Sequence, residues 1–345
     1  MKLELDTSME GLIELAARAR GEMTKVVVGQ EGILDIVLAA ILCEGHVLLE
    51  GVPGTGKTLI ARTAAGVLTL EFRRIQFTPD LMPADVIGAT MLEEKGGAYG
   101  LRFERGPVFA NMVLADEINR ASPKTQSALL EAMQERSVTV RGDTMALPRP
   151  FIVLATQNPL EMEGTYPLPE AQIDRFLFKA IVEHPGHDEL VRIVDGTTGS
   201  LFAEIRDVVP AEGLAALQKA VRDIVAPPAV VDYAARLVLA TQPARPEAPA
   251  SVRSYCRYGA GPRGAQALVL AAKAAALLDG RFHAGIKDLE RFLVPALRHR
   301  VSVNFEGQSE GVTPERLVAD AAAAARAALP PDSALGPEPA KDSAR

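Results

Sequence analysis

Residues 51–58 decide the fold, because they read GVPGTGKT and match the phosphate-binding loop pattern G-x-x-x-x-G-K-[ST]. An apolar run, His46 to Glu50, precedes the loop, and a helical pattern begins at Lys57. Glycines let backbone N–H groups converge on phosphate oxygens without clashes from Cβ atoms, and the helix N-terminus adds partial positive charge. We therefore expect Lys57 to reach the β- and γ-phosphates of a nucleotide and Thr58 to bind Mg²⁺. The nucleotide-binding residues predicted from this stretch are Gly51, Val52, Pro53, Gly54, Thr55, Gly56, Lys57 and Thr58.

Short apolar runs elsewhere indicate the other strands of the same sheet. They are Phe72 to Phe77, Met112 to Ala115, Phe151 to Thr156 and Phe176 to Val182. Such runs alternating with helical segments are typical of a parallel sheet that is covered on both faces. Ligands of these sheets bind at the carboxyl ends of the strands. The sequence therefore predicts an α/β fold with five parallel strands and a site at that edge.

Polar residues follow two of these runs. Asp116 and Glu117 end the strand that begins at Met112, and Asn158 follows the strand that begins at Phe151. An aspartate at this position can hold Mg²⁺, usually through water, and the next glutamate can orient and deprotonate an attacking water. Asn158, in ATQNP, could hydrogen-bond that water or the γ-phosphate. Taken alone, an Asn-Pro pair is equally a common turn after a strand.

The chain divides by pattern into three parts. We expect an α/β domain over residues 1–184 and an Ala-rich α-helical domain over residues 185–330, because the strand signals stop near residue 184. Residues 331–345 are small, polar and proline-rich and are expected to be disordered. Hairpins are expected near residues 90–105 and 137–148, with turns at Gly96, Gly97 and Gly100 and at Gly142-Asp143.

Composition limits the classes of protein that remain. The chain has 345 residues, a net charge of −7 and only two cysteines, Cys43 and Cys256, without a C-x-x-C pair. These features indicate a reduced, cytoplasmic protein, and the acidic balance gives no general support for nucleic-acid binding. The most apolar run, Ile33 to Cys43, is far shorter than the roughly 20 residues of a membrane span, and the N-terminus is not a signal peptide.

Four motifs together resemble the MoxR family of AAA+ ATPases: GVPGTGKT, LADEINRA, ATQNP and PEAQIDRF. The resemblance covers roughly residues 20–325. It implies an AAA+ P-loop αβα sandwich with a five-stranded parallel sheet, followed by an α-helical lid domain. The implied reaction is hydrolysis of ATP to ADP and phosphate with Mg²⁺, in a homo-oligomeric, hexameric ring. It also implies that the strand bearing Asn158 lies between the P-loop strand and the strand that ends in Asp116.

The resemblance assigns further site residues. Arg175 in IDRF matches the arginine finger that completes a neighbouring subunit's ATP site, although the residue pattern alone equally suits a structural ion pair. Arg263 in GPRG matches the sensor-2 arginine of the lid, acting on its own or a neighbour's nucleotide, and here the family's usual SPRA reads GPRG. The segment VVGQE matches the one that lies along the adenine, through Val28, Gly29 and Gln30.

The two expected hairpins also resemble parts of this family, namely the helix-2 insert and the pre-sensor-1 hairpin that face the ring pore. Tyr99, Leu101 and Arg141 are then candidates for contact with a substrate or partner. The alternative is that both are solvated hairpin tips.

For the biological role, the resemblance implies a chaperone-like remodeller that helps mature partner protein complexes or insert cofactors and metals into them. It also implies a partner with a von Willebrand factor A domain. The alternative is a nucleic-acid-directed AAA+ motor, against which stand the acidic balance and the lack of a dense Lys/Arg run with interleaved aromatics. A non-hydrolysing scaffold is disfavoured because Glu117 and Arg175 are both present. The sequence does not identify the client.

Overall fold

The computed structural model describes residues 6–95, 98–159, 164–198 and 208–329. Its chain forms two compact units. We call Arg18–Ala215 the sheet unit, and Met1–Ala17 together with Ala216–Arg345 the helical unit. Two helices cross the division along the chain: α1 (Met9–Val26) and α8 (Ala211–Asp223).

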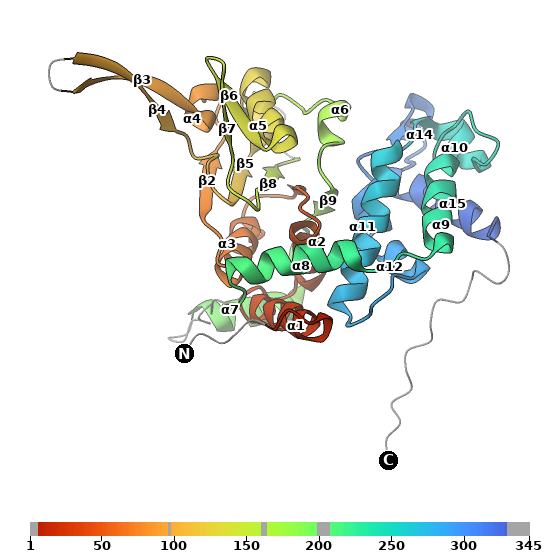
Figure 1. Ribbon diagram of the computed structural model, residues 1–345. Helices are drawn as coiled ribbons and strands as arrows, with labels where there is room; N and C mark the ends of the chain where they lie inside the picture. Colours follow the sequence, from red (N-terminus) through yellow and green to blue (C-terminus); the bar gives the residue numbers. More distant parts are fainter. Residues whose placement is uncertain (1–5, 96–97, 160–163, 199–207, 330–345) are drawn as a thin grey trace. The chain divides into compact units, whose positions relative to one another are not determined.

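A five-stranded parallel sheet organises the sheet unit (Figure 1). The strand order is β2-β5-β8-β1-β9, and every neighbouring pair is parallel. The strand bearing the P-loop, β1, therefore pairs with β8, and β8 pairs with β5, which confirms the expected arrangement of these three strands. The bounds are β1 (Val47–Glu50), β2 (Phe72–Gln76), β5 (Met112–Asp116), β8 (Ile152–Gln157) and β9 (Phe178–Ile181).

The central strands are buried on both faces, as their continuous apolar sequence requires. Val113 and Ala115 of β5 and Val153 of β8 pack with Leu129 and Met133 of α5 in one core cluster. The helix α5 begins after Ser122, which accepts a hydrogen bond from the Thr125 N–H, and it has a proline at its first position. The helices of this unit are α2 (Glu31–Leu42), α3 (Lys57–Val67), α4 (Pro83–Ile87), α5 (Pro123–Glu135), α6 (Glu170–Ile173) and α7 (His187–Thr198), with a 3₁₀ turn at Ile118–Arg120.

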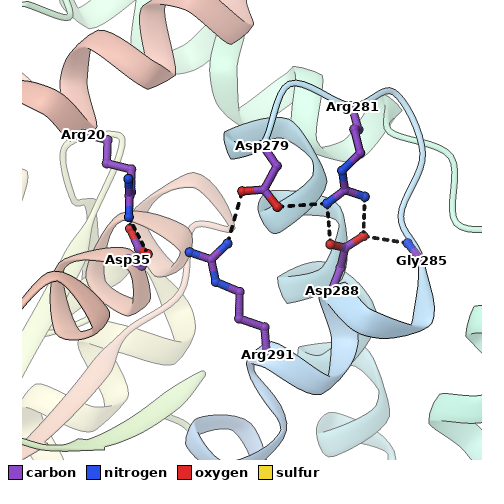
Figure 2. A network of polar contacts seen from close by, with 7 residues as sticks. All are labelled: Arg20, Asp35, Asp279, Arg281, Gly285, Asp288 and Arg291. Atoms are coloured by element: carbon purple, nitrogen blue, oxygen red, sulfur yellow. Dashed lines mark hydrogen bonds and ion pairs between the residues drawn. The ribbon is translucent and has the colours of Figure 1, made fainter. Parts of the chain in front are cut away.

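An ion pair joins α1 to α2 within the sheet unit. Arg20 donates from Nε and Nη2 to the two carboxylate oxygens of Asp35, at 2.5 and 3.0 Å (Figure 2). Asp35 is buried, so its charge needs such a partner. The ion pair joins the two helices that flank residues 27–30, and Gln30 of that segment contacts the P-loop.

Two antiparallel hairpins leave the sheet. The first, of β3 (Gly88–Lys95) and β4 (Ala98–Arg105), extends away from the sheet (Figure 1). Gly100 lies inside β4, opposite Glu93, so the expectation of a turn there was wrong; Gly96 and Gly97 lie outside the described residues. The second pairs β6 (Ser137–Val140) with β7 (Asp143–Ala146).

The β6–β7 turn comprises Arg141 and Gly142, one residue earlier than expected. Both have positive φ, +54° and +92°, and Val140 pairs with Asp143 across the turn. Two left-handed residues give the turn a twist that matches the right-handed twist of the strands. Asp143 therefore is the first residue of β7 and does not lie in the turn.

Helices α9, α11 and α15 pack together in the helical unit, with α12 against α9 and α11. A short antiparallel pair of strands also occurs there, between Cys256–Tyr258 and Ser302–Val303, where the sequence predicted helices alone. The elements are α9 (Pro228–Ala240), α10 (Ala250–Tyr255), β10 (Cys256–Tyr258), α11 (Pro262–Leu278), α12 (Ile286–Arg291), α13 (Leu293–Leu297), β11 (Ser302–Val303), α14 (Phe305–Ser309) and α15 (Pro314–Ala327).

Charged side chains close the loop between α11 and α12. Arg281 donates to both carboxylate oxygens of Asp288 and to Asp279, and Arg291 donates to the other oxygen of Asp279 (Figure 2). The Gly285 N–H also donates to Asp288. These hydrogen bonds, the Asp288 ones chief among them, raise the pKa of the Arg281 guanidinium, which stays charged.

The division between the units differs from the one expected at residue 184. Residues 185–215 belong to the sheet unit. Glu189 of α7 lies against Gly29, and the backbone N–H groups of Val208 and Val209 donate to the Val67 carbonyl at the end of α3. These long-range contacts are not visible in the local composition. The expected disordered tail, 331–345, lies outside the described residues.

Within the described ranges, none of the helices combines the length and apolar character that a membrane crossing requires.

One buried histidine links three elements of the sheet unit. His46 precedes β1, and its Nδ1 accepts a hydrogen bond from the Val153 N–H of β8 at 3.0 Å. Its Nε2 therefore carries the proton and faces the Met133 carbonyl of α5 at 3.2 Å. Burial lowers the pKa of His46 from 6.5 to about 4. The ring is neutral in the folded protein at neutral pH, and protonation would cost the bond from Val153.

We expect His46 to make folding sensitive to mild acid. Because its folded pKa lies below its unfolded value, its contribution is complete above pH 6.5 and is lost as the pH falls toward 4. The free energy of unfolding should fall by about 3 kcal/mol more in the wild type than in His46→Gln over this window. Urea titrations at several pH values measure this difference. The control is His187→Gln, since His187 is 89% exposed; equal pH slopes for wild type and His46→Gln would contradict the assignment.

Candidate functional site

A pocket of about 460 Å³ lies at the carboxyl ends of β1, β5 and β8. It joins the three motifs that the sequence singled out, which lie far apart along the chain. The lining residues are Gly51, Pro53, Gly54, Thr55, Gly56, Lys57, Thr58, Leu59, Arg74, Gln76, Asp116, Glu117, Thr156, Gln157 and Asn158.

The glycine-rich loop forms one wall of the pocket. Gly54 and Gly56 have φ of +85° and +81°, a region that side-chain-bearing residues rarely adopt, and α3 begins directly afterwards at Lys57. The Thr55 hydroxyl donates to the Val52 carbonyl at 3.0 Å. Gln30 donates from Nε2 to the Thr55 carbonyl at 2.9 Å, so the VVGQE segment supports this loop directly.

The side chain of Lys57 folds back onto its own loop. Its ammonium donates to the carbonyls of Gly51 and Val52 at 2.8 and 2.7 Å. Burial lowers the pKa of Lys57, and the negative charges of Asp116 and Glu117 act in the opposite direction. The loop, the start of α3 and this ammonium thus present several N–H donors and a positive charge to one space, which suits a phosphate group.

Thr156 couples the two carboxylates on the opposite wall. Its hydroxyl donates to Asp116 Oδ1 at 2.6 Å and accepts the Glu117 backbone N–H at 2.8 Å. Glu117 has φ of +56° and ψ of +50°, a left-handed conformation that is uncommon for glutamate. The hydroxyl therefore fixes the direction of Asp116 and stabilises the turn that aims Glu117. Thr156 is buried, so both bonds form away from water.

Three basic or amide side chains contact the same carboxylates, and the sequence analysis did not predict these contacts. Arg74 of β2 donates from Nε and Nη2 to Asp116 Oδ2, at 3.0 and 2.7 Å. Gln76 donates to Glu117 Oε2 at 2.8 Å, and Arg120 donates to the same oxygen at 2.9 Å. Arg74 and Gln76 are two residues apart on β2 and so share a face, next to β5. The strand FRRIQ reads locally as a strand with exposed charges, and only its pairing with β5 reveals these contacts.

Asn158 follows β8, is buried and lines the pocket together with Lys57 and Glu117. This position is compatible with the contact to a water or γ-phosphate that the sequence suggested. Of the predicted nucleotide-binding residues in the loop, Val52 contributes through its carbonyl to Lys57.

Arg175 lies in a different pocket, of about 200 Å³, between α5 and α6. Its Nη1 donates to the Leu130 carbonyl at 2.8 Å, and Gln172, Glu131 and Glu135 are among the other lining residues. Arg263 is the second residue of α11, in the helical unit, and Pro262 begins that helix. Val28 and Gly29 precede α2, and Gly29 has φ of +76°.

The β3–β4 hairpin carries exposed apolar side chains. Tyr99 and Leu101 are 70% and 63% exposed, and Leu92 pairs across the strands with Leu101. Residues two apart lie on one face of a strand, so Leu92, Leu101 and Tyr99 form one apolar face. Arg141, on the other hairpin, is exposed at the β6–β7 turn.

Replacement of Thr156 by valine tests the coupling of the two carboxylates. The substitution keeps the shape but leaves the Glu117 N–H and Asp116 Oδ1 without their shared partner, at a cost of about 1–3 kcal/mol. We expect the rate of ATP turnover, the activity that the sequence predicts, to fall about 10- to 100-fold, with ATP affinity nearly unchanged because the glycine loop is intact. Steady-state kinetics and equilibrium binding measure the two quantities. Thr156→Ser retains the hydroxyl and should stay near wild type; undiminished turnover in Thr156→Val would rule the coupling out.

Comparison with protein families agrees with this geometry. Residues 46–178 match the model of the ATPase family associated with various cellular activities (AAA). Residues 249–321 match the AAA lid domain. The first match contains the glycine loop, both carboxylates, Asn158 and Arg175, and the second contains Arg263.

Relatives of similar length are also found. Chaperone MoxR1 of Mycobacterium tuberculosis is 41% identical over 90% of this chain and 82% of its own. Protein MoxR of Paracoccus denitrificans is 34% identical over 86% of this chain and 91% of its own. Among solved structures, a putative ATPase from Cytophaga hutchinsonii is 37% identical, with a TM-score of 0.84 over 90% of this chain and 94% of its own. The chain therefore belongs to the MoxR family of AAA+ ATPases and hydrolyses ATP.

Proposed function

We propose that the chain is a Mg²⁺-dependent ATPase subunit of a homo-oligomeric, hexameric ring in the cytoplasm. The ring uses ATP hydrolysis to remodel partner proteins, as a chaperone-like factor in the maturation of protein complexes or the insertion of their cofactors or metals. The observation that carries the proposal is the single pocket in which the glycine loop, Lys57, Asp116, Glu117 and Asn158 meet.

In this proposal the phosphates of ATP lie on the glycine loop. The N–H groups at the start of α3 and the ammonium of Lys57 bind them, after Lys57 exchanges its bonds to Gly51 and Val52 for phosphate oxygens. Val28, Gly29 and Gln30 lie along the adenine, and the bond from Gln30 to Thr55 links that segment to the loop.

The residues present fit a magnesium ion. Thr58 and Asp116 line the same pocket and supply a hydroxyl and a carboxylate, the hard oxygen ligands that Mg²⁺ prefers. Bound there, Mg²⁺ would neutralise charge on the phosphates. Thr156 keeps Asp116 directed toward this position.

Glu117 acts as the base that orients and deprotonates the attacking water, and Asn158 hydrogen-bonds that water or the γ-phosphate. Both side chains line the pocket opposite Lys57. Glu117 must first leave Gln76 and Arg120, which now occupy Oε2. Arg263 acts as the sensor-2 arginine of the lid.

Arg175 acts as the arginine finger of a neighbouring subunit's site. Its position in a pocket separate from the glycine loop supports this role, because a side chain that served its own nucleotide would line the first pocket. Its Nη1 donates to the Leu130 carbonyl, and within the described part of the chain no carboxylate forms an ion pair with it, which weakens the alternative of a structural ion pair.

The β3–β4 hairpin contacts the protein client or an adaptor. The exposed face of Leu92, Leu101 and Tyr99 supports this, because an exposed apolar patch on a projecting hairpin is typical of a surface that binds another protein. A partner with a von Willebrand factor A domain is what the family resemblance suggests.

Mixing two inactive variants tests the ring and the finger together. Glu117→Gln should bind ATP and hydrolyse it about 10²- to 10⁴-fold more slowly, because the base is lost. Arg175→Ala should bind ATP and also hydrolyse it slowly, because charge on the transferring phosphoryl group is uncompensated. Where an Arg175→Ala subunit receives the finger of a Glu117→Gln neighbour, the shared site has both groups. The mixture should therefore exceed both parents in ATPase rate.

The control is a fluorescently labelled subunit that reports exchange between oligomers. If subunits exchange and the mixture is no faster than its parents, Arg175 does not act between subunits. A chain that remains monomeric with ATP, as judged by sedimentation, would refute the ring itself.

A further inference from the structure

Arg74 saturates one oxygen of Asp116. A carboxylate oxygen has about two lone-pair sites, and Asp116 Oδ2 accepts two N–H groups from the one guanidinium, at 3.0 and 2.7 Å. The other oxygen, Oδ1, accepts the Thr156 hydroxyl at 2.6 Å. The carboxylate that is proposed to serve Mg²⁺ therefore already has a cationic partner.

In the ion pair between Arg74 and Asp116, the carboxylate is largely buried and the guanidinium is half exposed. The Asp116 side chain is 13% exposed, so its charge is poorly hydrated and favours a nearby cation. The Arg74 side chain is 50% exposed, so water can solvate the guanidinium once it leaves. Arg74 Nη2 also donates to Gln76 Oε1 at 2.8 Å, which holds the guanidinium in this orientation.

A metal-bound water that approaches Oδ2 would need the lone pairs that Arg74 occupies. Mg²⁺ commonly reaches a carboxylate through its own waters, and each such water donates a hydrogen bond to a carboxylate oxygen. A guanidinium and a hydrated dication cannot both occupy Oδ2, and their charges repel each other at this range.

We infer that Arg74 competes with the divalent cation for Asp116, and that a metal-bound water reaches Oδ2 by displacing the guanidinium. Arg74 stands in for the metal's charge in the nucleotide-free chain and weakens metal affinity in the nucleotide-bound one. The inference rests on the proposed nucleotide site. It adds Arg74 as a residue that sets the affinity of this site for Mg²⁺.

The neighbouring residue provides a matched control. Arg73 lies on the other face of β2, is exposed, and pairs with Glu71 rather than with a residue of the pocket. Arg73→Gln removes the same charge from the same strand without freeing Asp116.

The test measures binding of Mn²⁺, which prefers the same oxygen ligands as Mg²⁺. The loss of the electron paramagnetic resonance signal of free Mn²⁺ reports its binding to the one-to-one complex of the full chain with ADP. We expect Arg74→Gln to bind Mn²⁺ about three- to tenfold more tightly than wild type, with Arg74→Lys between them and Arg73→Gln unchanged. Thermal melting of each variant confirms that it is folded.

Equal Mn²⁺ affinity in wild type and Arg74→Gln would overturn the inference, since nothing would then have been displaced. Weaker binding in Arg74→Gln would also overturn it, because Arg74 would be helping to hold the metal complex. Failure of the wild type to bind ADP, measured by calorimetry beforehand, would refute the nucleotide site itself. That result is distinct from a failure of the competition alone.

Discussion

The parallel pairing of β1 with β8, and of β8 with β5, is the constraint on which the site depends. The turns at Gly54 and Gly56 become part of a site because β1 lies beside β8, the strand that carries Thr156. The register places Ala115 opposite Ala155, so the residues that follow each of them, Asp116 and Thr156, emerge at the same edge. The glycine loop, the Asp116-Glu117 pair and the segment from Thr156 to Asn158, which lie far apart along the chain, thereby line one pocket.

Within that pocket the polar groups are arranged in a closed set of hydrogen bonds. Thr156 connects Asp116 to the backbone of Glu117, and Arg74 and Gln76 of the next strand take the free carboxylate oxygens. Burial makes each unpaired group costly, so nucleotide binding must exchange partners rather than simply add them. Lys57 illustrates this, because its ammonium is satisfied by its own loop before any phosphate arrives.

Much of this was accessible from the sequence. The glycine loop, the five strands and the Asp-Glu pair are local patterns, and the structure and the comparisons confirm the fold and the family that they predicted. Arg74 and Gln76 were missed, because their importance comes from the pairing of β2 with β5, which no local window contains. Thr156 lay inside a quoted motif, but its hydroxyl has a role only once Asp116 is beside it.

The boundary near residue 184 was misjudged for a similar reason. The composition becomes helical there, but α7 and the residues after it contact Gly29 and Val67 and so belong to the sheet unit. The turn lies at Arg141-Gly142, one residue before the Gly-Asp pair that the sequence favoured, and both of its residues have the positive φ that a two-residue type I′ turn requires.

The central claim is that the glycine loop binds the phosphates of ATP through Lys57. Calorimetry with a slowly hydrolysed ATP analogue tests it directly, on wild type, Lys57→Ala and Lys124→Ala, the last at an exposed lysine of α5. The account predicts that Lys57→Ala lowers affinity by about 100-fold or more, because the main charge partner of the phosphates is gone, while Lys124→Ala binds as wild type does. Unchanged affinity in a folded Lys57→Ala protein would contradict the assignment of this pocket as the ATP site.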